Sequence, residues 1–490
     1  MAGLVLLAIG LRLIPIVFVP SMVWADEIFQ TSEQAHRLVY GSGLVPWEFQ
    51  LGMRSWLLPG VIAALMELSR IAGDGPDYYI PLIASSFAAL AAAPVVCGFL
   101  WGRRLFGPLG GWIAGALVAV APEAVYFGAR TLSETVAAHL LIVGLYVLEP
   151  GYRVASRRRL FVGGAVLGLV FMLRIQLAPA LVVVALWTSW RPVCERAPAL
   201  LAGAAVVLAA AGILDIVTLG SPLASVWRNF IYNIYYNASS TFGVEPWHFY
   251  LLGELGVWGG GAATLVLLAG LGARRMPLPL AAAVTIIAVH SAIAHKEYRF
   301  IYPAIMLVMA LAGIGLAQVA AWGRDWLLDR GVRPRTATAG SVALVLSWWC
   351  LVSFHVWTGA ALTAHRYRGH DNLRAVSFVA HGSPVCGLGL YGLDGEDWGN
   401  YGGYTYLHRP VPMYWPKDDA EFDVLAAGFD TLVYIKAPPE GLGFTPQRCF
   451  GQVCVARRSG GCAPLPMLAM PFPAPVPRPP AARQPVTPEQ

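Results

Sequence analysis

Long apolar runs separated by short polar segments make up most of the chain up to about position 360. A helix that crosses a lipid bilayer needs about 20 mostly apolar residues. Runs of this kind predict spans at 3–20, 81–101, 109–128, 132–149, 199–219, 251–272, 278–294, 301–320 and 339–359. Two shorter runs, 160–174 and 176–190, flank Arg174 and predict a broken or tilted pair. We therefore expect an all-α polytopic membrane protein with about eleven transmembrane helices.

The composition agrees with this pattern. Of the 490 residues, 57% are hydrophobic and only 13% are charged, whereas an ordinary soluble domain is about 25% charged. So few charges cannot cover the surface of a soluble protein of this length. The net charge of +6 does not indicate a nucleic-acid partner, because most Arg residues lie in short runs between apolar segments, where they set the membrane orientation. Membrane lipids are the expected surroundings.

Five basic clusters predict the cytoplasmic side. They are Arg103 with Arg104, Arg153 with 157–159, Arg191 with Arg196, Arg274 with Arg275, and the segment 324–335. Eleven spans and a cytoplasmic N-terminus place all five on one side. This topology requires that the apolar stretch 56–71 does not cross, so we expect a re-entrant or in-plane helix within a first external loop, 21–80. A second external loop is expected at 220–250.

The chain changes character after the last predicted span. Residues 1–360 form the predicted transmembrane catalytic domain, and 361–462 are polar and rich in Gly and aromatics. Alternating apolar positions at 430–437 and 448–457 predict strands, and hence a small external α+β domain. Four cysteines lie there, at 386, 449, 454 and 462. They predict two disulfides with three possible connectivities. Residues 463–490 hold ten Pro and predict a disordered tail.

Asp26 and Glu27 follow directly after the first predicted span. Two adjacent carboxylates at a membrane boundary most often only mark the water interface. The loop that follows, however, interleaves Trp47, Glu48 and Arg54 with apolar residues, a pattern typical of an interfacial segment with its polar groups facing a cavity. This pattern favours a functional role for the acidic pair.

A second polar cluster, from His295 to Phe300, lies between two predicted spans. Cationic residues at an external boundary oppose the usual bias, and they have two explanations. The side chains extend to the interface only for solvation, or they hold an anion such as a lipid phosphate, with Glu297 orienting a cation. Arg130, Glu134 and Arg174 are further ionisable residues on the same side, and such residues are functional candidates at membrane depth.

The segment 229–251 carries amides and aromatics, including Asn229, Asn233, Trp247 and His248. These groups stack on sugars and hydrogen-bond to them, but the same composition is typical of an interfacial aromatic belt. The sequence alone leaves both explanations open.

No Gly-rich phosphate loop, His-rich metal motif or Ser/His/Asp arrangement is recognisable in the sequence. We therefore expect no metal and no cofactor. Without a nucleotide-binding loop, a phosphorylated substrate must arrive already activated, most simply as a lipid phosphate.

The run His-Lys-Glu-Tyr-Arg-Phe at 295–300 resembles the His-Lys-Glu-x-Arg-Phe signature of glycosyltransferase family 22. These α-mannosyltransferases use dolichyl-phosphate-mannose. The resemblance covers about residues 1–360, and Ala25 departs from it where the family usually has Pro. Its other elements are Asp26 with Glu27, Trp47 with Glu48, Arg54 through Pro59, Arg130-Thr131-Leu132, Asn229-Phe230, Asn233, Phe242-Gly243, Pro246-Trp247-His248 and Tyr250.

The resemblance implies the GT-C fold and an inverting transfer of a hexose, most simply mannose, from a polyprenyl- or dolichyl-phosphate donor to a glycan or glycolipid acceptor. Asp26 is then the expected catalytic base, and Glu27 shares that role or holds the acceptor. The donor phosphate is expected near His295, Lys296, Arg299 and Arg130. Substrate contacts are expected from Trp47, Glu48, Arg54, Arg174, Asn229, Asn233, Trp247, His248 and Glu297.

A transporter or flippase of lipid-linked sugars is the alternative, because intramembrane charges and broken helices serve transport too. Against it, no inverted repeat is evident and the charges gather at one face. Arg-rich composition and compact loops favour a bacterial plasma membrane with a periplasm-facing site. In a eukaryote, the endoplasmic reticulum membrane would take its place.

Overall fold

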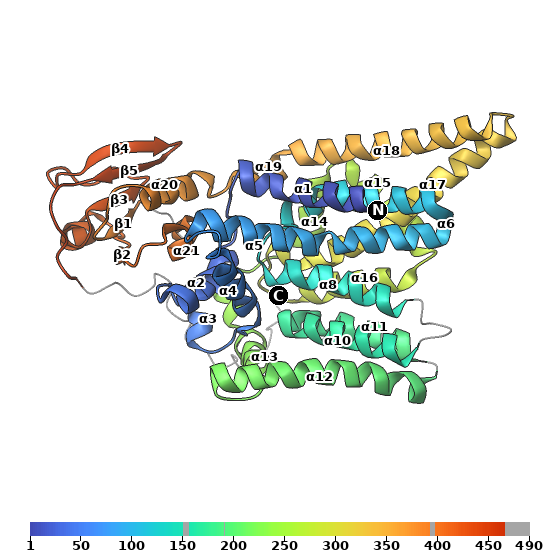
Figure 1. Ribbon diagram of the computed structural model, residues 1–490, viewed down its shortest axis with the longest axis horizontal. Helices are drawn as coiled ribbons and strands as arrows, with labels where there is room; N and C mark the ends of the chain where they lie inside the picture. Colours follow the sequence, from blue (N-terminus) through green and yellow to red (C-terminus); the bar gives the residue numbers. More distant parts are fainter. Residues whose placement is uncertain (150–155, 191, 393–396, 466–490) are drawn as a thin grey trace, which may run out of the picture.

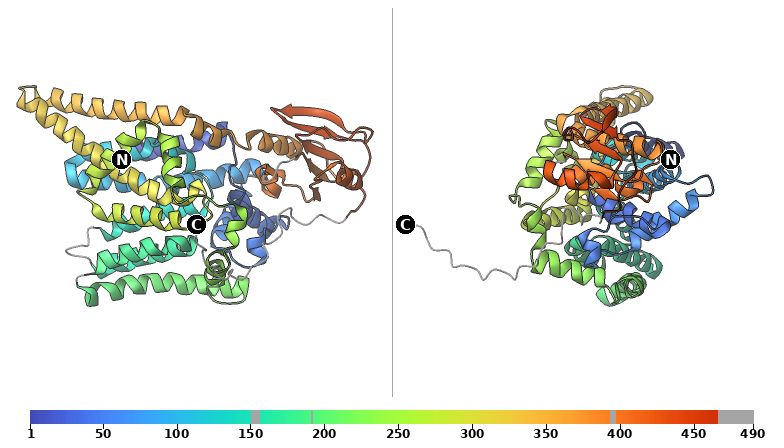
Figure 2. Two further views of the ribbon diagram at one scale, coloured as in Figure 1. Left: turned by 180° about the vertical axis from the view of Figure 1, so that it is seen from behind. Right: turned by 90° about the vertical axis from the view of Figure 1, so that its left-hand side faces the viewer.

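The computed structural model describes residues 1–149, 156–190, 192–392 and 397–465. It has two parts (Figure 1): a bundle of long helices that run in similar directions, and a small sheet with short helices at one end of the bundle. Viewed from that end, the sheet lies in front of the bundle (Figure 2). Arg153, Arg191 and nearly all of the Pro-rich tail, which the sequence analysis singled out, lie outside the described residues.

The bundle helices follow the apolar runs of the sequence. They are α1 (Ala2–Phe18), α5 (Pro76–Ala91), α6 (Ala93–Val120), α7 (Pro122–Phe127), α8 (Ser133–Leu148), α10 (Arg157–Leu173), α11 (Ala178–Ser189), α12 (Val193–Leu219), α14 (Phe249–Trp258), α15 (Gly261–Ala273), α16 (Pro277–Ala292), α17 (Tyr302–Asp329) and α18 (Pro334–Thr358).

Helix α17 forms the centre of the bundle and is buried along most of its length. It packs against α6, α8, α15, α16 and α18. Small residues permit these close contacts: a Cβ atom on Gly315 of α17 would lie 1.9 Å from the carbonyl oxygen of Leu268 in α15. Close backbone approach through small residues is typical of helices that pack within a membrane.

The chain reverses within α6, where Phe106 and Gly107 leave helical geometry and Gly107 has a φ of +74°. The two halves pack back on each other, because a Cβ atom on Gly102 would meet the carbonyl oxygen of Gly110 at 2.4 Å. Arg103 and Arg104 directly precede this turn. The turn between α17 and α18 lies at the bundle end far from the sheet (Figure 1), as the predicted orientation requires.

Among the described residues, four helical segments are long and apolar enough to cross a membrane: Pro76–Val120, Val193–Leu219, Tyr298–Asp329 and Pro334–Thr358. The pair α14 and α15 adds a fifth if it forms one broken span. The sequence predicted a single span at 251–272, but the two helices meet at 109° at Gly259, whose φ is +50°. The predicted spans 3–20, 132–149, 176–190 and 278–294 correspond to apolar helices of 10–17 residues, and 160–174 corresponds to α10, which has 17 residues. The count of eleven stays a prediction.

The predicted external loops contain short helices. The first loop holds η1 (Ile28–Ser32), α2 (Glu33–Tyr40), α3 (Trp47–Gln50) and α4 (Leu57–Ser69). Helix α4 has 13 residues, about 20 Å, and runs across the bundle direction at the sheet end (Figure 1). The re-entrant or in-plane placement expected for 56–71 stays a prediction. The remaining short helices are η2 (Ile175–Leu177), α13 (Ala224–Phe230), η3 (Ile231–Tyr235), η4 (Ala238–Phe242) and η5 (Tyr298–Ile301).

The C-terminal part is an α+β arrangement. Its elements are α19 (Ala360–Tyr367), α20 (His370–His381), β1 (Leu388–Tyr391), η6 (Asp397–Tyr401), α21 (Gly403–Leu407), β2 (Met413–Tyr414), α22 (Asp419–Leu425), η7 (Ala426–Gly428), β3 (Thr431–Tyr434), β4 (Thr445–Phe450) and β5 (Val453–Arg457). The sheet order is β2-β1-β3-β5-β4. Strand β1 pairs in parallel with β2 and β3, and the other pairs are antiparallel.

The β structure predicted at 448–457 is confirmed: the segment holds the end of β4 and all of β5, which form a hairpin that turns at Gly451 with a φ of +57°. The two predicted disulfides are confirmed. Cys449 bonds Cys454 across that hairpin, and Cys386 bonds Cys462. The second bond ties the start of β1 to the segment after β5.

Glu33 joins the first loop to the C-terminal part. Its side chain is fully buried, and its carboxylate accepts hydrogen bonds from the backbone N–H groups of Leu44, Tyr404 and Thr405 at 2.9, 3.0 and 2.9 Å. The Thr405 hydroxyl donates a fourth at 2.8 Å. A buried carboxylate is stable only when it is satisfied in this way. The contact therefore fixes α2 against α21.

Candidate active site

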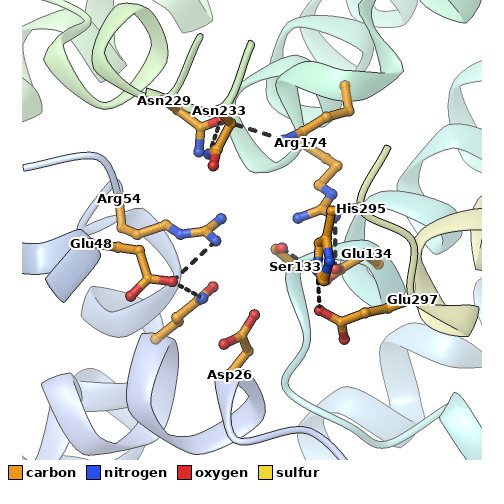
Figure 3. Close-up of polar contacts among 12 residues, drawn as sticks. Asp26, Glu48, Arg54, Ser133, Glu134, Arg174, Asn229, Asn233, His295 and Glu297 are labelled. Atoms are coloured by element: carbon orange, nitrogen blue, oxygen red, sulfur yellow. Dashed lines mark hydrogen bonds and ion pairs between the residues drawn. The ribbon is translucent and has the colours of Figure 1, made fainter. Parts of the chain in front are cut away.

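A cavity of about 340 Å³ lies where the first loop, η2, η3 and the segment before η5 meet. Five cationic side chains and three carboxylates from the described residues line it, a formal excess of two positive charges. The labelled side chains in Figure 3 surround its open centre. The cationic residues are Arg54, Arg174, Lys296, Arg299 and Arg368, and the acidic residues are Asp26, Glu48 and Glu297.

Asp26 lies just before η1 and turns its carboxylate into the cavity. Its Oδ2 atom lies 2.5 Å from Nη2 of Arg299. The Asp26 side chain keeps 32% of its surface exposed, whereas Arg299 keeps 3%. The Asp26 carboxylate is therefore accessible to a molecule in the cavity, and its ion pair with the buried Arg299 guanidinium holds it in position.

Arg299 bridges three carboxylates. Besides Asp26, its Nε lies 2.8 Å from Glu297 and its Nη1 lies 3.2 Å from Glu134. Glu134 also pairs with Arg174, whose Nη2 is 3.0 Å away. Buried charges require close partners of opposite sign. This network therefore holds the side chains of the cavity wall in fixed positions.

The residues before Arg299 form a second set of contacts. Nε2 of His295 lies 3.2 Å from Glu297. Burial alone would raise the pKa of the Glu297 carboxyl, but the Arg299 charge and the hydrogen bonds from His295 and Arg299 hold it well below its usual value. Lys296 donates to the carbonyl oxygens of Glu245 at 2.7 Å and Ile293 at 2.5 Å.

Glu48 and Arg54 lie on the opposite wall (Figure 3). Glu48 accepts a hydrogen bond from Gln30 at 2.8 Å, and Nη2 of Arg54 is 3.7 Å away. Burial, and then the charge of Asp26, raise the pKa of Glu48 to about 7. Beside it, Trp47 stacks on Phe242 with ring centroids 5.7 Å apart. Carboxylate and indole together suit recognition of a sugar.

Asn233 lines the cavity from the π-helix η3. Its side-chain amide donates to Oδ1 of Asn229 at 3.3 Å, and Gln176 donates to the same oxygen at 3.4 Å. Asn229 thus lies behind Asn233 and orients it, and Gln176 also reaches the cavity.

Five predicted site residues do not line the cavity: Glu27, Arg130, Trp247, His248 and Asn229, which was described above. Glu27 pairs with Arg130 at 2.8 Å, both are buried, and Arg130 also bonds Oγ of Ser21 at 2.8 Å. This pair holds the segment before Asp26 against the start of α8. Trp247 is 68% exposed, and it and His248 lie outside the cavity lining. The other ten predicted site residues line the cavity.

From the sequence, Glu134 was a functional candidate without a specific role, and Glu123 was not singled out. Glu123 is fully buried and accepts hydrogen bonds from Nε1 of Trp258 at 2.7 Å and from the Tyr298 hydroxyl. It thereby anchors Tyr298, which directly precedes Arg299. Glu123 lies within the predicted span 109–128, and this position was the signal that could have identified it.

The profile of the Alg9-like mannosyltransferase family matches residues 4–376. GPI mannosyltransferase 3 of Yarrowia lipolytica is 28% identical over 317 residues, 62% of this chain and 60% of that protein. GPI alpha-1,2-mannosyltransferase 3 of Danio rerio is 25% identical over 335 residues, 64% of this chain and 59% of that protein. The chain thus spans about 60% of the length of these curated relatives.

Among solved structures, ArnT from Cupriavidus metallidurans bound to undecaprenyl phosphate aligns with a TM-score of 0.60 at 15% identity, covering 95% of this chain and 99% of ArnT. This likeness shows the GT-C fold that the sequence resemblance implied. Together with the profile match over most of the chain, it confirms the resemblance. The chain belongs to the Alg9-like mannosyltransferase family.

Proposed function

We propose that the protein transfers mannose from a polyprenyl- or dolichyl-phosphate donor to a hydroxyl group of a glycan or glycolipid acceptor. One observation carries the proposal: Asp26, a partly exposed carboxylate, faces a cavity with an excess of positive charge. The carboxylate suits deprotonation of a hydroxyl group, and the cations suit a phosphate leaving group. Membership of the family supports mannose as the sugar.

In the proposed reaction the acceptor hydroxyl gives its proton to Asp26 as its oxygen attacks the anomeric carbon. The bond from that carbon to the phosphate oxygen breaks, and its electron pair stays on the phosphate. Attack opposite the leaving group inverts the anomeric centre. The cations of the cavity stabilise the charge that grows on the phosphate, so no general acid is required. With this charge stabilisation from Lys and Arg, we propose that transfer needs no metal or cofactor.

The relatives are named for GPI mannosylation, which favours a glycosylphosphatidylinositol-like glycolipid as acceptor. These relatives are eukaryotic, and they suggest the endoplasmic reticulum membrane rather than the bacterial plasma membrane that the composition favoured. The cavity lies at the bundle end that carries the sheet. We propose that this end faces the lumen or periplasm.

Transport without transfer is the less favoured alternative, because the relatives are named as transferases. The test uses purified protein in liposomes with dolichyl-phosphate-mannose labelled in the sugar and a GPI-like glycolipid acceptor. We expect label in the acceptor, removable by an α-mannosidase and unaffected by a metal chelator. Label that crosses the bilayer while still attached to the donor lipid, with none in the acceptor, would instead support the transporter.

A further inference from the structure

Most cationic side chains in the cavity already have partners. Arg299 contacts three carboxylates, and Arg174 pairs with Glu134. Lys296 donates to backbone carbonyl oxygens, and Arg54 lies near Glu48. A phosphate that bound to any of these cationic side chains would have to share that side chain with its present carboxylate or carbonyl partner.

Arg368 differs from these residues. It lies where α19 ends, lines the cavity and is exposed. Within the described parts of the chain, its guanidinium makes no hydrogen bond and no ion pair. It therefore offers an unshared positive charge to the same space that Asp26 faces.

The backbone of Arg368 is nevertheless held firmly. Its carbonyl oxygen accepts a hydrogen bond from the N–H of Met22 at 2.9 Å. The next residue, Gly369, has a φ of +69°, and a Cβ atom there would lie 2.8 Å from the Met22 carbonyl oxygen. Nδ1 of His370 lies 2.8 Å from the carbonyl oxygen of Pro20. These contacts fix the position of Arg368 relative to the segment that leads to Asp26.

We propose that Arg368 binds the phosphate of a lipid-linked substrate. The inference rests on the proposed function and adds a binding residue from the C-terminal segment to it. A guanidinium presents two parallel N–H donors to a phosphate and stays charged at every relevant pH. The phosphate has two possible sources: the phosphodiester of the sugar donor, or a phosphate group on the glycolipid acceptor.

The experiment compares Arg368→Gln and Arg368→Lys with Arg374→Gln as the matched control. Arg374 is exposed on α20, does not line the cavity and stacks on Phe450, so its loss removes the same charge elsewhere. Three quantities are measured: the affinity for polyprenyl phosphate alone, the KM for the donor, and the KM for acceptors with and without a phosphate group. Thermal unfolding of each variant establishes that it is folded.

If the donor supplies the phosphate, Arg368→Gln weakens polyprenyl phosphate binding and raises the donor KM about 10- to 100-fold, and Arg368→Lys recovers part of the loss. If the acceptor supplies it, only the KM for the phosphate-bearing acceptor rises. Wild-type values for all three quantities in folded Arg368→Gln would overturn the inference. Failure of the wild-type protein to transfer mannose would contradict the proposed function instead, and polyprenyl phosphate binding would still test Arg368.

Discussion

Nη2 of Arg299 lies 2.5 Å from Oδ2 of Asp26, although 273 positions separate the two residues in the sequence. The proposed base and the motif that faces the proposed leaving group are thus in direct contact. A hydroxyl group that approaches Asp26 also comes close to the cations near which the phosphate is expected. Reacting groups held together in this way need little rearrangement for an in-line transfer.

Asp26→Asn should abolish most of the transfer. An amide keeps the shape of the side chain but cannot accept the proton, so we expect kcat to fall about 10²- to 10⁴-fold with donor binding retained. Glu27→Gln is the matched control, because Glu27 pairs with Arg130 away from the cavity. That variant should unfold more easily and keep its kcat per folded molecule. An active Asp26→Asn with an inactive Glu27→Gln would reassign the base.

Arg299→Lys should reduce transfer although it keeps the positive charge. An ammonium group cannot form the planar set of contacts that links Asp26, Glu134 and Glu297. We expect a fall in kcat/KM of about 10- to 100-fold. Steady-state kinetics in liposomes measure it, with Lys296→Ala as a second variant. Unchanged kinetics in both would leave only the explanation that these cations extend to the interface for solvation.

Glu48 should make stability depend on pH. The pKa of Glu48 is about 7 in the folded state, above the ordinary value of 4.5. Between these two pH values the Glu48 carboxyl therefore stays protonated in the folded protein but loses its proton in the unfolded chain. Stability contributed by this group therefore falls as the pH rises from about 4.5 to about 7, by up to about 3 kcal/mol. Glu48→Gln stays neutral and should flatten this part of the profile. The test is the unfolding temperature of the wild-type protein and of Glu48→Gln, measured from pH 4.5 to pH 7. If the two proteins showed the same pH dependence, the raised pKa of Glu48 would be refuted.

The two disulfides should differ in their effect on stability. Cys386 and Cys462 close a loop of 76 positions, whereas Cys449 and Cys454 are five apart. Closing the longer loop lowers the conformational entropy of the unfolded chain more than closing the shorter one. In the chain-entropy account this difference adds about 2 kcal/mol to the free energy of unfolding. Cys386→Ser with Cys462→Ser should therefore expose the C-terminal part to protease more than the other double variant does. Equal protease resistance would contradict this.

The predicted orientation can be tested with accessibility tags. Tags after Arg275 and Arg330 should be cytoplasmic, and a tag after Gly461 should face the lumen or periplasm, because the basic clusters share one side. A cytoplasmic tag at Gly461 would rule out an odd number of spans.

The sequence allowed the apolar helices, the disulfide-forming cysteines and the cavity residues around Asp26 and Arg299 to be predicted, because each is marked by a local pattern or motif. The partner of a charged side chain has no such local mark. Glu27 and Arg130 were predicted to act on substrates, yet they neutralise each other. The α14–α15 bend was missed because apolar composition does not distinguish a straight helix from one broken at Gly259.

The Glu33 contact has a practical consequence for engineering. The family profile ends at residue 376, but three of the four groups that donate to this carboxylate belong to Tyr404 and Thr405. A chimaera that exchanged only the matched region with a relative would separate Glu33 from these three donors, and a buried carboxylate would keep only the hydrogen bond from Leu44. Functional chimaeras should therefore exchange the first loop and the segment around α21 together. For the same reason, substitutions near residue 404 should disturb the position of the first loop although they lie in the C-terminal part.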